Sequence, residues 1–437
     1  MIAAIPIETA IVAMLDIRAE AVFLCCLWPC ILRENNNSMF NEKKLNYLLI
    51  KNTFLFWVFL FSYSSLISQE IVLPGINQLE KIITNLQGKK IGVVANQSSI
   101  LRESNKNQHL VDYLIQNKID IEKVFAPEHG FRGKADAGEK IKTEKDKNTG
   151  LEIISLYGKN RKPSVEKLNG IELMIFDLQD VGVRFYTYLS TLHYVMEACA
   201  ENNIPLIVLD RPNPNIQYVD GPILESTYKS FVGMHPVPIV YGMTIGEYAQ
   251  MINGEGWLNN KIKVELKIIP IKNYTRDTFY ELPIRPSPNL PNSKAIALYP
   301  SLCLMETTVY SIGRGTELQF QIYGHPEYKY RNFSFKPRPN FGSKYPKHNN
   351  VLCYGKDLSN VPSPKKIELK WIIDAYRNFP YPDSFFLNGF NRIAGNSKLK
   401  QQLVNGTSEI EIRKSWVKDL NEFKKVREKY LIYFKEY

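Results

Sequence analysis

Acidic residues that could serve as a general acid and as a base or nucleophile occur at several points of the 437-residue chain. Glu128 and Glu139 flank a glycine-rich loop that also carries cations, and Asp177, Asp180 and Asp210 each end an apolar run. Glycosidic bond cleavage requires two carboxyl groups, one protonated as a general acid and one ionised as a base or nucleophile. For any single acid, capping a helix or pairing with a nearby arginine is the simpler explanation, so the argument depends on their being brought together.

Polar segments follow four apolar runs, over residues 96–99, 127–133, 177–182 and 210–214. The carboxyl ends of parallel strands share one edge of an open sheet, where ligands bind in the crevice beyond the strands. Polar loops follow strands in any α/β protein. However, ordinary turns seldom concentrate Glu, His, Arg, Asp, Gln and Asn so heavily, and we expect these loops to converge on one pocket.

The elements that would position these loops alternate between about residues 88 and 290. Apolar runs predict strands and amphipathic runs predict helices, which together indicate an α/β class with an open, mostly parallel, Rossmann-like sheet covered on both faces. The expected strands are 91–95, 121–126, 152–156, 173–176 and 204–209, and the expected helices are 109–118 and 187–203.

The first 70 residues differ in composition from the rest. Basic residues from Lys43 to Lys51, an apolar block over 54–61 and small polar residues over 62–68 follow the order of a signal peptide. The block is far short of the roughly 20 residues that span a bilayer, which disfavours the alternative of a permanent membrane anchor. No cysteine lies near residues 68–69 for lipoprotein attachment. We therefore expect a periplasmic or secreted protein.

Four regions are predicted from these patterns. They are 1–38 as a mis-assigned leader, with Met39 the true initiator, 39–68 as the signal peptide, 71–290 as the Rossmann-like catalytic domain, and 291–437 as a smaller α+β auxiliary domain. In the last region, residues 323–354 are expected to be irregular, and helices are expected within 358–379 and over 416–434. Exposed Tyr328 and Tyr330 could stack on sugar rings, although packing between elements is the commoner role of such tyrosines.

Composition and missing motifs exclude several classes. The turn after Ala95 contains no glycine, and neither GxGxxG, GxxxxGK[ST] nor GxSxG occurs, so no nucleotide cofactor and no serine-esterase elbow is expected. Scattered histidines and cysteines predict no metal site, and Cys199 fits a buried core thiol. The net charge of +11 suits anionic partners, but its even spread along the chain disfavours nucleic acid.

Long motifs in fixed order give the chain a resemblance to a known family. They are VANQSS (94–99), FAPEHGFRG (125–133), DAGE (136–139), FDLQDVGVRFYTY (176–188), VLDRPNP (208–214), GMTIGEYA (242–249), PSPNLP (286–291) and GRGTE (313–317). Over residues 71–437 this order resembles the bacterial exo-β-N-acetylmuramidase family, long catalogued as a domain of unknown function. The resemblance implies release of N-acetylmuramic acid from the non-reducing end of peptidoglycan fragments, without a nucleotide, and it makes Glu128 the proton donor.

The partner of Glu128 is less settled, and Glu139 is our inference from its position. The substrate's own N-acetyl group is an alternative to a protein nucleophile. Expected substrate-binding residues are Asn96, His129, Arg132, Asp177, Gln179, Asp180, Arg184, Tyr186, Asp210, Arg211, Asn213, Asn289 and Arg314. The sequence departs from the family after the GRGT motif, where Phe320 lacks a preceding proline, and after Tyr299, where a glycine-threonine pair is missing.

Muramic acid differs from glucosamine by a 3-O-lactyl ether that bears a carboxylate, which a guanidinium can bind through two parallel hydrogen bonds. We expect Arg184 and Arg211 to bind this carboxylate, with Arg132 and Arg314 as alternatives. Arg211 can instead pair with Asp210 or a neighbouring acid. The expected partners are muropeptides and MurNAc-GlcNAc, and no oligomeric state is predicted. A non-enzymatic peptidoglycan-binding protein and an amidase or esterase acting on wall peptides remain the alternative functions.

Overall fold

The computed structural model describes residues 71–103, 106–128, 130–131 and 144–434 of the chain. Residues 71–437 form one compact unit by their internal contacts. The expected leader and signal peptide lie outside the described residues. The two-domain boundary at 290–291 stays a prediction, and one large core cluster includes side chains on both sides of it, from Val94 to Phe423.

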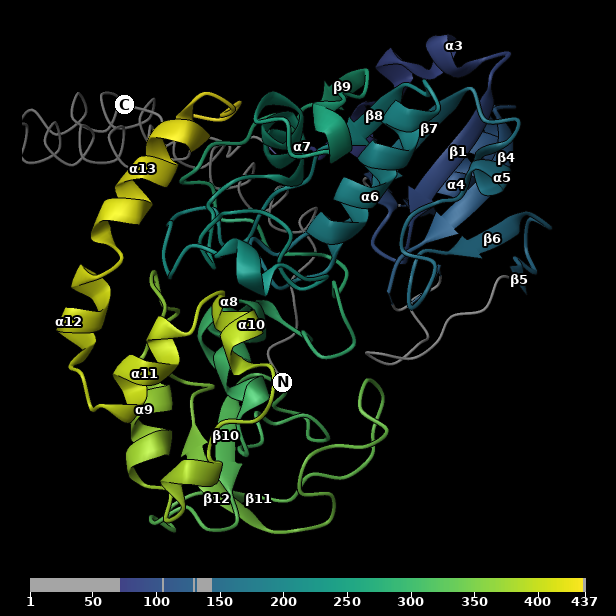
Figure 1. Cartoon of the computed structure of the whole chain (residues 1–437). Helices are drawn as coiled ribbons and strands as arrows, with labels where there is room; N and C mark the ends of the chain where they lie inside the picture. Colours follow the sequence, from purple (N-terminus) through teal and green to yellow (C-terminus); the bar gives the residue numbers. More distant parts are fainter. Residues whose placement is uncertain (1–70, 104–105, 129, 132–143, 435–437) are drawn as a thin grey trace, which may run out of the picture. The chain divides into compact units, whose positions relative to one another are not determined.

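A seven-stranded sheet, of which six strands are parallel, forms the first part of this unit (Figure 1). The parallel strands are β1 (Lys90–Ala95), β4 (Asp120–Ala126), β6 (Glu152–Ser155), β7 (Leu173–Asp177), β8 (Leu206–Leu209) and β9 (Leu266–Ile269). Their spatial order is β6-β4-β1-β7-β8-β9, and the short β5 (Glu144–Lys145) pairs antiparallel with β6 at the edge. This is the Rossmann-type order, which reverses between β1 and β7. The α/β, Rossmann-like prediction is confirmed.

Alternating side chains on each strand explain why both faces of the sheet are covered. In β1, Ile91, Val93 and Ala95 pack into one core cluster, whereas Val94 packs into the other. The first face carries α3 (Ile83–Leu86) and α4 (Leu110–Gln116), and the second carries α5 (Val165–Leu168), α6 (Tyr188–Glu201) and α7 (Ile245–Gly254). Cys199, on α6, is fully buried, as expected for a core thiol.

The C-terminal part combines helices with a three-stranded antiparallel sheet. The strands are β10 (Ile322–His325), β11 (Ser334–Phe335) and β12 (Cys353–Asp357), in the order β10-β12-β11. The helices are α8 (Ser293–Leu302), α9 (Lys370–Arg377), α10 (Phe390–Ala394), α11 (Lys398–Val404), α12 (Glu409–Lys414) and α13 (Val417–Glu428).

Three sequence-based expectations for local structure need correction. The region 323–354 is not irregular throughout, since its ends form strands β10 and β12. Tyr328 is fully buried, because its hydroxyl donates to Asp374 Oδ2 at 2.8 Å and its ring packs against Tyr310. Strand β9 and the hairpin of β2 (Ile100–Glu103) with β3 (Lys106–His109) were not predicted, although apolar and polar residues alternate over 264–268, which is a strand pattern.

Candidate active site

A pocket of about 370 Å³ is lined by the loops that follow β4, β6 and β7 and by segments of the C-terminal part. It lies at the carboxyl edge of the parallel sheet, where ligand sites of this fold occur. Two carboxylates, three guanidinium groups, four tyrosines and an amide are part of its polar lining: Glu128, Glu306, Arg161, Arg314, Arg392, Tyr157, Tyr186, Tyr188, Tyr299 and Asn289. Such a mixture of charges and aromatic rings suits a polar ligand with flat apolar faces, such as a sugar.

Glu128 enters this pocket two residues after β4 ends. Its Oε2 accepts a hydrogen bond from Thr187 Oγ1 at 2.9 Å, at the N-terminus of α6. The hydroxyl of Tyr188 donates to the main-chain oxygen of Glu128 at 3.4 Å. Burial, followed by the nearby charge of Glu128, raises the pKa of Tyr157, which therefore remains a neutral phenol hydrogen-bonded to this carboxyl group. The carboxyl group is thus held in a fixed orientation at the pocket wall.

A second carboxylate, Glu306, reaches the pocket from the turn that follows α8. Arg314 donates to it through two bonds, Nε to Oε1 at 2.6 Å and Nη2 to Oε2 at 3.0 Å, and about a quarter of each side chain is exposed. Burial alone would lower the pKa of Arg314, but Glu306 raises it above its usual value. The ammonium group of Lys347 donates to the main-chain oxygens of Glu306 and Thr308, both at 2.6 Å, and so fixes this turn.

Sequence reasoning missed Glu306, although the GRGTE motif eight residues later contains its partner Arg314. It also missed Arg161 and Arg392, which line the same pocket as exposed guanidinium groups. Arg161 lies over the ring of Phe231 at 4.3 Å from the centroid. Neither arginine belongs to a recognisable motif.

Four residues of the predicted site line the pocket: Glu128, Tyr186, Asn289 and Arg314. The hydroxyl of Tyr186 donates to the main-chain oxygen of Pro286 at 2.8 Å. The Nδ2 of Asn289 donates to Gly342 O at 2.7 Å, while its Oδ1 is buried without a partner among the described residues. Because a buried amide oxygen is costly to leave unpaired, Asn289 is the best-placed neutral group for a ligand hydroxyl.

The acids at the ends of β7 and β8 lie elsewhere. Asp177 is fully buried and forms a bidentate pair with Arg211, Nε to Oδ1 at 2.5 Å and Nη2 to Oδ2 at 2.8 Å. The alternative role for Arg211 is therefore the observed one, with Asp177 as its acid. Asp180 accepts hydrogen bonds from the Tyr241 hydroxyl and from Gly182 N, and burial raises its pKa to about 6.

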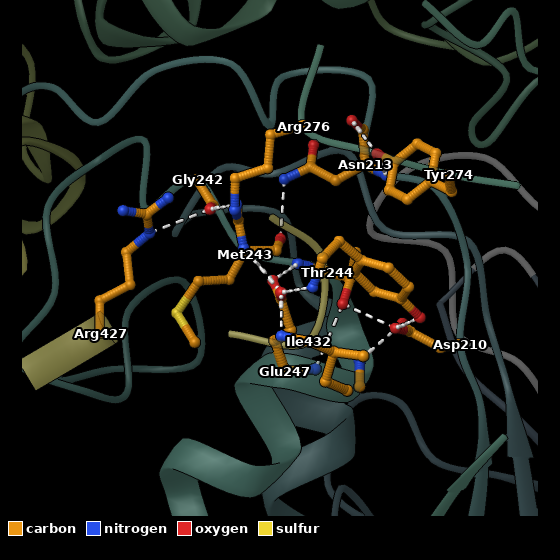
Figure 2. Close-up of polar contacts among 12 residues, drawn as sticks. Asp210, Asn213, Gly242, Met243, Thr244, Glu247, Tyr274, Arg276, Arg427 and Ile432 are labelled. Carbon is orange, nitrogen blue, oxygen red and sulfur yellow. Dashed lines mark hydrogen bonds and ion pairs between the residues drawn. The ribbon is translucent and has the colours of Figure 1, made fainter. Parts of the chain in front are cut away.

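Asp210 belongs to a buried network of polar contacts beside α7 (Figure 2). Its side-chain oxygens accept hydrogen bonds from the hydroxyls of Thr244 and Tyr433, both at 2.7 Å, and from the backbone of Gly246 at 2.8 Å. Burial nonetheless raises the pKa of Asp210 to about 7. The side chain is fully buried and is not part of the pocket lining.

The same network anchors the C-terminal segment to the first part of the chain. Glu247, fully buried, pairs with Arg276 Nη2 at 2.6 Å and accepts from the backbone of Ile432 at 2.8 Å (Figure 2). Arg427 donates to Gly242 O at 3.1 Å. These carboxylates therefore join the end of the chain to the sheet.

Arg184 is also buried, and it binds main-chain oxygens instead of facing the pocket. Its Nη1 donates to Pro222 O and Val237 O, and its Nη2 donates to Ile393 O and Ala394 O, at 2.7–3.1 Å. Both terminal nitrogens are thus used within the protein. The expectation that Arg184 and Arg211 approach the crevice is corrected: each is held by protein acceptors.

The remaining predicted site residues divide into two groups. Asn96, Gln179 and Asn213 are buried, and their side-chain amides donate to the Tyr188 hydroxyl at 2.7 Å, to Pro212 O at 2.7 Å and to Met243 O at 2.8 Å, respectively. They shape the loops behind the pocket. His129, Arg132 and Glu139 lie outside the described residues.

The described part of the chain contains no helix that is long and apolar enough to cross a membrane. No group of three or more His, Cys, Asp or Glu side chains in these same residues could hold a metal ion.

A Rossmann-ordered sheet places the protein in the α/β class, and its polar pocket lies at the carboxyl edge, where proteins of this class bind their ligands. Two family profiles cover most of the chain: "Exo-beta-N-acetylmuramidase NamZ, N-terminal" matches residues 91–294, and the C-terminal profile of the same description matches residues 297–433. The chain belongs to the exo-β-N-acetylmuramidase NamZ family.

Known relatives support this membership. The peptidoglycan beta-N-acetylmuramidase NamZ of Bacillus subtilis (strain 168) is 38% identical over 376 residues, which are 80% of this chain and 88% of the relative. A crystal structure of a DUF1343 family protein from Bacteroides fragilis is 44% identical with a TM-score of 0.77, covering 84% of this chain and all of the other. A second such protein from that organism is 27% identical with a TM-score of 0.69, covering 83% and 99%.

Proposed function

We propose that the protein is an exo-acting glycoside hydrolase that releases N-acetylmuramic acid from the non-reducing end of peptidoglycan fragments such as MurNAc-GlcNAc and muropeptides. The observation that carries this proposal is the position of Glu128, the glutamate of the EHG motif, in a pocket with a second carboxylate and three arginines. The 38% identity to a relative named for this activity supports the substrate class.

In this mechanism, Glu128 donates a proton to the glycosidic oxygen as its bond to the anomeric carbon breaks, and one water molecule supplies both the hydroxyl group that the anomeric carbon gains and the proton that returns to Glu128. Hydrogen bonds from Thr187 and Tyr157 restrain its carboxyl group at the pocket wall. Glu306 keeps Arg314 in place through two charged hydrogen bonds, and Glu139 is the proposed partner carboxylate of the reaction.

Two isomeric disaccharides provide the direct test of this proposal. MurNAc-GlcNAc should be split into its two sugars, whereas GlcNAc-MurNAc should remain intact, as followed by chromatography of the products. Cleavage of both disaccharides would contradict the non-reducing-end specificity. Tight binding without product would favour a peptidoglycan-binding protein, and release of amino acids from muropeptides would favour an amidase.

We also propose that the protein is exported and that its mature form begins near Gln69. The support is the sequence order of basic, apolar and small polar residues over 39–68. N-terminal sequencing of protein recovered from the periplasm or medium tests this proposal. Residues 1–38 on the exported protein would contradict both the start site and the signal peptide.

A further inference from the structure

A second hollow of about 400 Å³ adjoins the candidate active site, and Arg392 lines both. Its charged lining consists of Arg392, Lys229 and Lys400, without any carboxylate among its described lining residues. We refer to it as the cationic annex. A surface hollow with three cations and no acid is suited to an anionic group.

Arg392 lies on α10, and the structure fixes this helix from the side of the sheet. Arg184 donates from Nη2 to Ile393 O at 3.1 Å and to Ala394 O at 2.8 Å, immediately after Arg392 in the chain. Gly395, which follows, leaves room for that guanidinium, since a Cβ there would lie 2.4 Å from Arg184 Nη2. The buried arginine of the β7 loop therefore positions the segment that carries the exposed one.

The guanidinium of Arg392 differs from those of Arg211 and Arg314, which are paired, and from that of Arg161, which lies over the ring of Phe231. Arg211 and Arg314 form bidentate pairs with Asp177 and Glu306. In the part of the chain that the structure describes, no carboxylate pairs with Arg392, and the residue is exposed. A guanidinium binds a carboxylate through two parallel hydrogen bonds, and among the described residues the guanidinium of Arg392 has no carboxylate partner.

We propose that Arg392 binds the carboxylate of a substituent on the sugar in the active-site pocket. The cationic annex would hold the part of that substituent that extends beyond the sugar. This inference rests on the proposed function and adds the group that separates muramic acid from glucosamine. The carboxylate has two possible sources, the free 3-O-lactyl acid or an acidic peptide attached to it.

The first test measures binding, so it does not depend on turnover. Titration calorimetry compares N-acetylmuramic acid with its neutral methyl ester for the native protein, Arg392→Met and the control Arg377→Met, an exposed arginine of α9. We expect the native protein to bind the acid about 10- to 100-fold more tightly, as for a charged hydrogen bond. Arg392→Met should lose this preference, Arg392→Lys should regain part of it, and Arg377→Met should keep it.

An equal preference for the acid in Arg392→Met and the native protein would overturn the proposal, as would a native protein that does not distinguish acid from ester. Failure of the proposed function gives a different result, namely no hydrolysis of MurNAc-GlcNAc whatever the binding ratio. Thermal unfolding of Arg392→Met should match that of the native protein, because the side chain is exposed.

A second comparison identifies the source of the carboxylate, with muramyl dipeptide as the probe. If the free lactyl acid is read, Lys229→Met and Lys400→Met leave binding of N-acetylmuramic acid within about twofold, and the dipeptide binds no better. If a peptide is read, the dipeptide binds more tightly and both lysine variants remove the increment. Loss of dipeptide binding in Arg377→Met, but not in the three annex variants, would contradict the site.

Discussion

Two groups of carboxylates occur at the carboxyl edge of the same sheet, and they have opposite surroundings. Asp177 and Asp210, after β7 and β8, are fully buried and satisfied by protein donors. Glu128, after β4, lines the pocket together with Glu306 from the C-terminal part. Position at a strand end therefore does not by itself bring an acid into the pocket. All four acids accept hydrogen bonds from the protein, but Asp177 and Asp210 are fully enclosed whereas Glu128 and Glu306 also line the cavity.

The largest expected effect is on the chemistry at Glu128. Removing a general acid typically costs 10²–10⁴-fold in rate, so Glu128→Gln should lower kcat on MurNAc-GlcNAc by about that factor. A nitrophenyl muramide has a better leaving group that needs less protonation, and it should lose less. Full activity of the variant on both substrates would place Glu128 with the structural acids instead.

Removing the charge of a buried acid should lower the stability of the protein. Asp177→Asn leaves Arg211 as an unpaired buried charge, which typically costs about 3–5 kcal/mol of unfolding free energy. Chemical denaturation should reveal this loss, while kcat per folded molecule stays near that of the native enzyme. A selective loss of kcat at unchanged stability would return Asp177 to the catalytic group.

Glu306 provides an intermediate case, because it is paired and still lines the pocket. Glu306→Gln should lower kcat/KM about 10- to 100-fold, the range for a charged hydrogen bond of roughly 1.5–3 kcal/mol. Arg314→Met should do the same. If the two act as one unit, the double variant should be no worse than either single variant. Additive losses would indicate that each contacts the substrate independently.

Asp210 should make the unfolding free energy depend on pH. Its pKa is raised by burial to about 7 from 3.8, so the neutral form favours the folded state and its contribution to stability is lost as pH rises from about 4 to about 7. One group contributes up to about 1.4 kcal/mol per pH unit in that window. Asp210→Asn should flatten the pH dependence of unfolding free energy, whereas the exposed control Asp383→Asn should leave it unchanged. An unaltered slope in Asp210→Asn would contradict this assignment.

The smallest expected effect concerns the end of the chain. Tyr433 donates to Asp210 at 2.7 Å and accepts from the backbone of Ile271 at 2.7 Å. Tyr433→Phe removes both hydrogen bonds and should cost about 1–3 kcal/mol of unfolding free energy without changing KM. An increased KM would show that the tail also shapes the pocket.

The sequence by itself determined the sheet, the class and the place of Glu128. Apolar runs of four to seven residues, such as 91–95, predict the strands. The polar residues that follow these runs indicate which edge of the sheet carries the polar loops. Long motifs in fixed order identified the family, which the comparisons support. These features depend on neighbours in sequence, so no tertiary information was needed to find them.

Only the tertiary structure decided which polar residues face the pocket. Asp177 meets Arg211 34 positions away, and Arg184 meets Ala394 210 positions away. Glu306 and Arg392 reach the site from segments that carry no periodic pattern. Which charged residues pair depends on the path by which distant segments return to the sheet edge. Hydrophobic periodicity describes only neighbouring residues, so it does not predict these pairs. The sequence therefore predicts where polar groups gather, and packing determines which of them line the pocket.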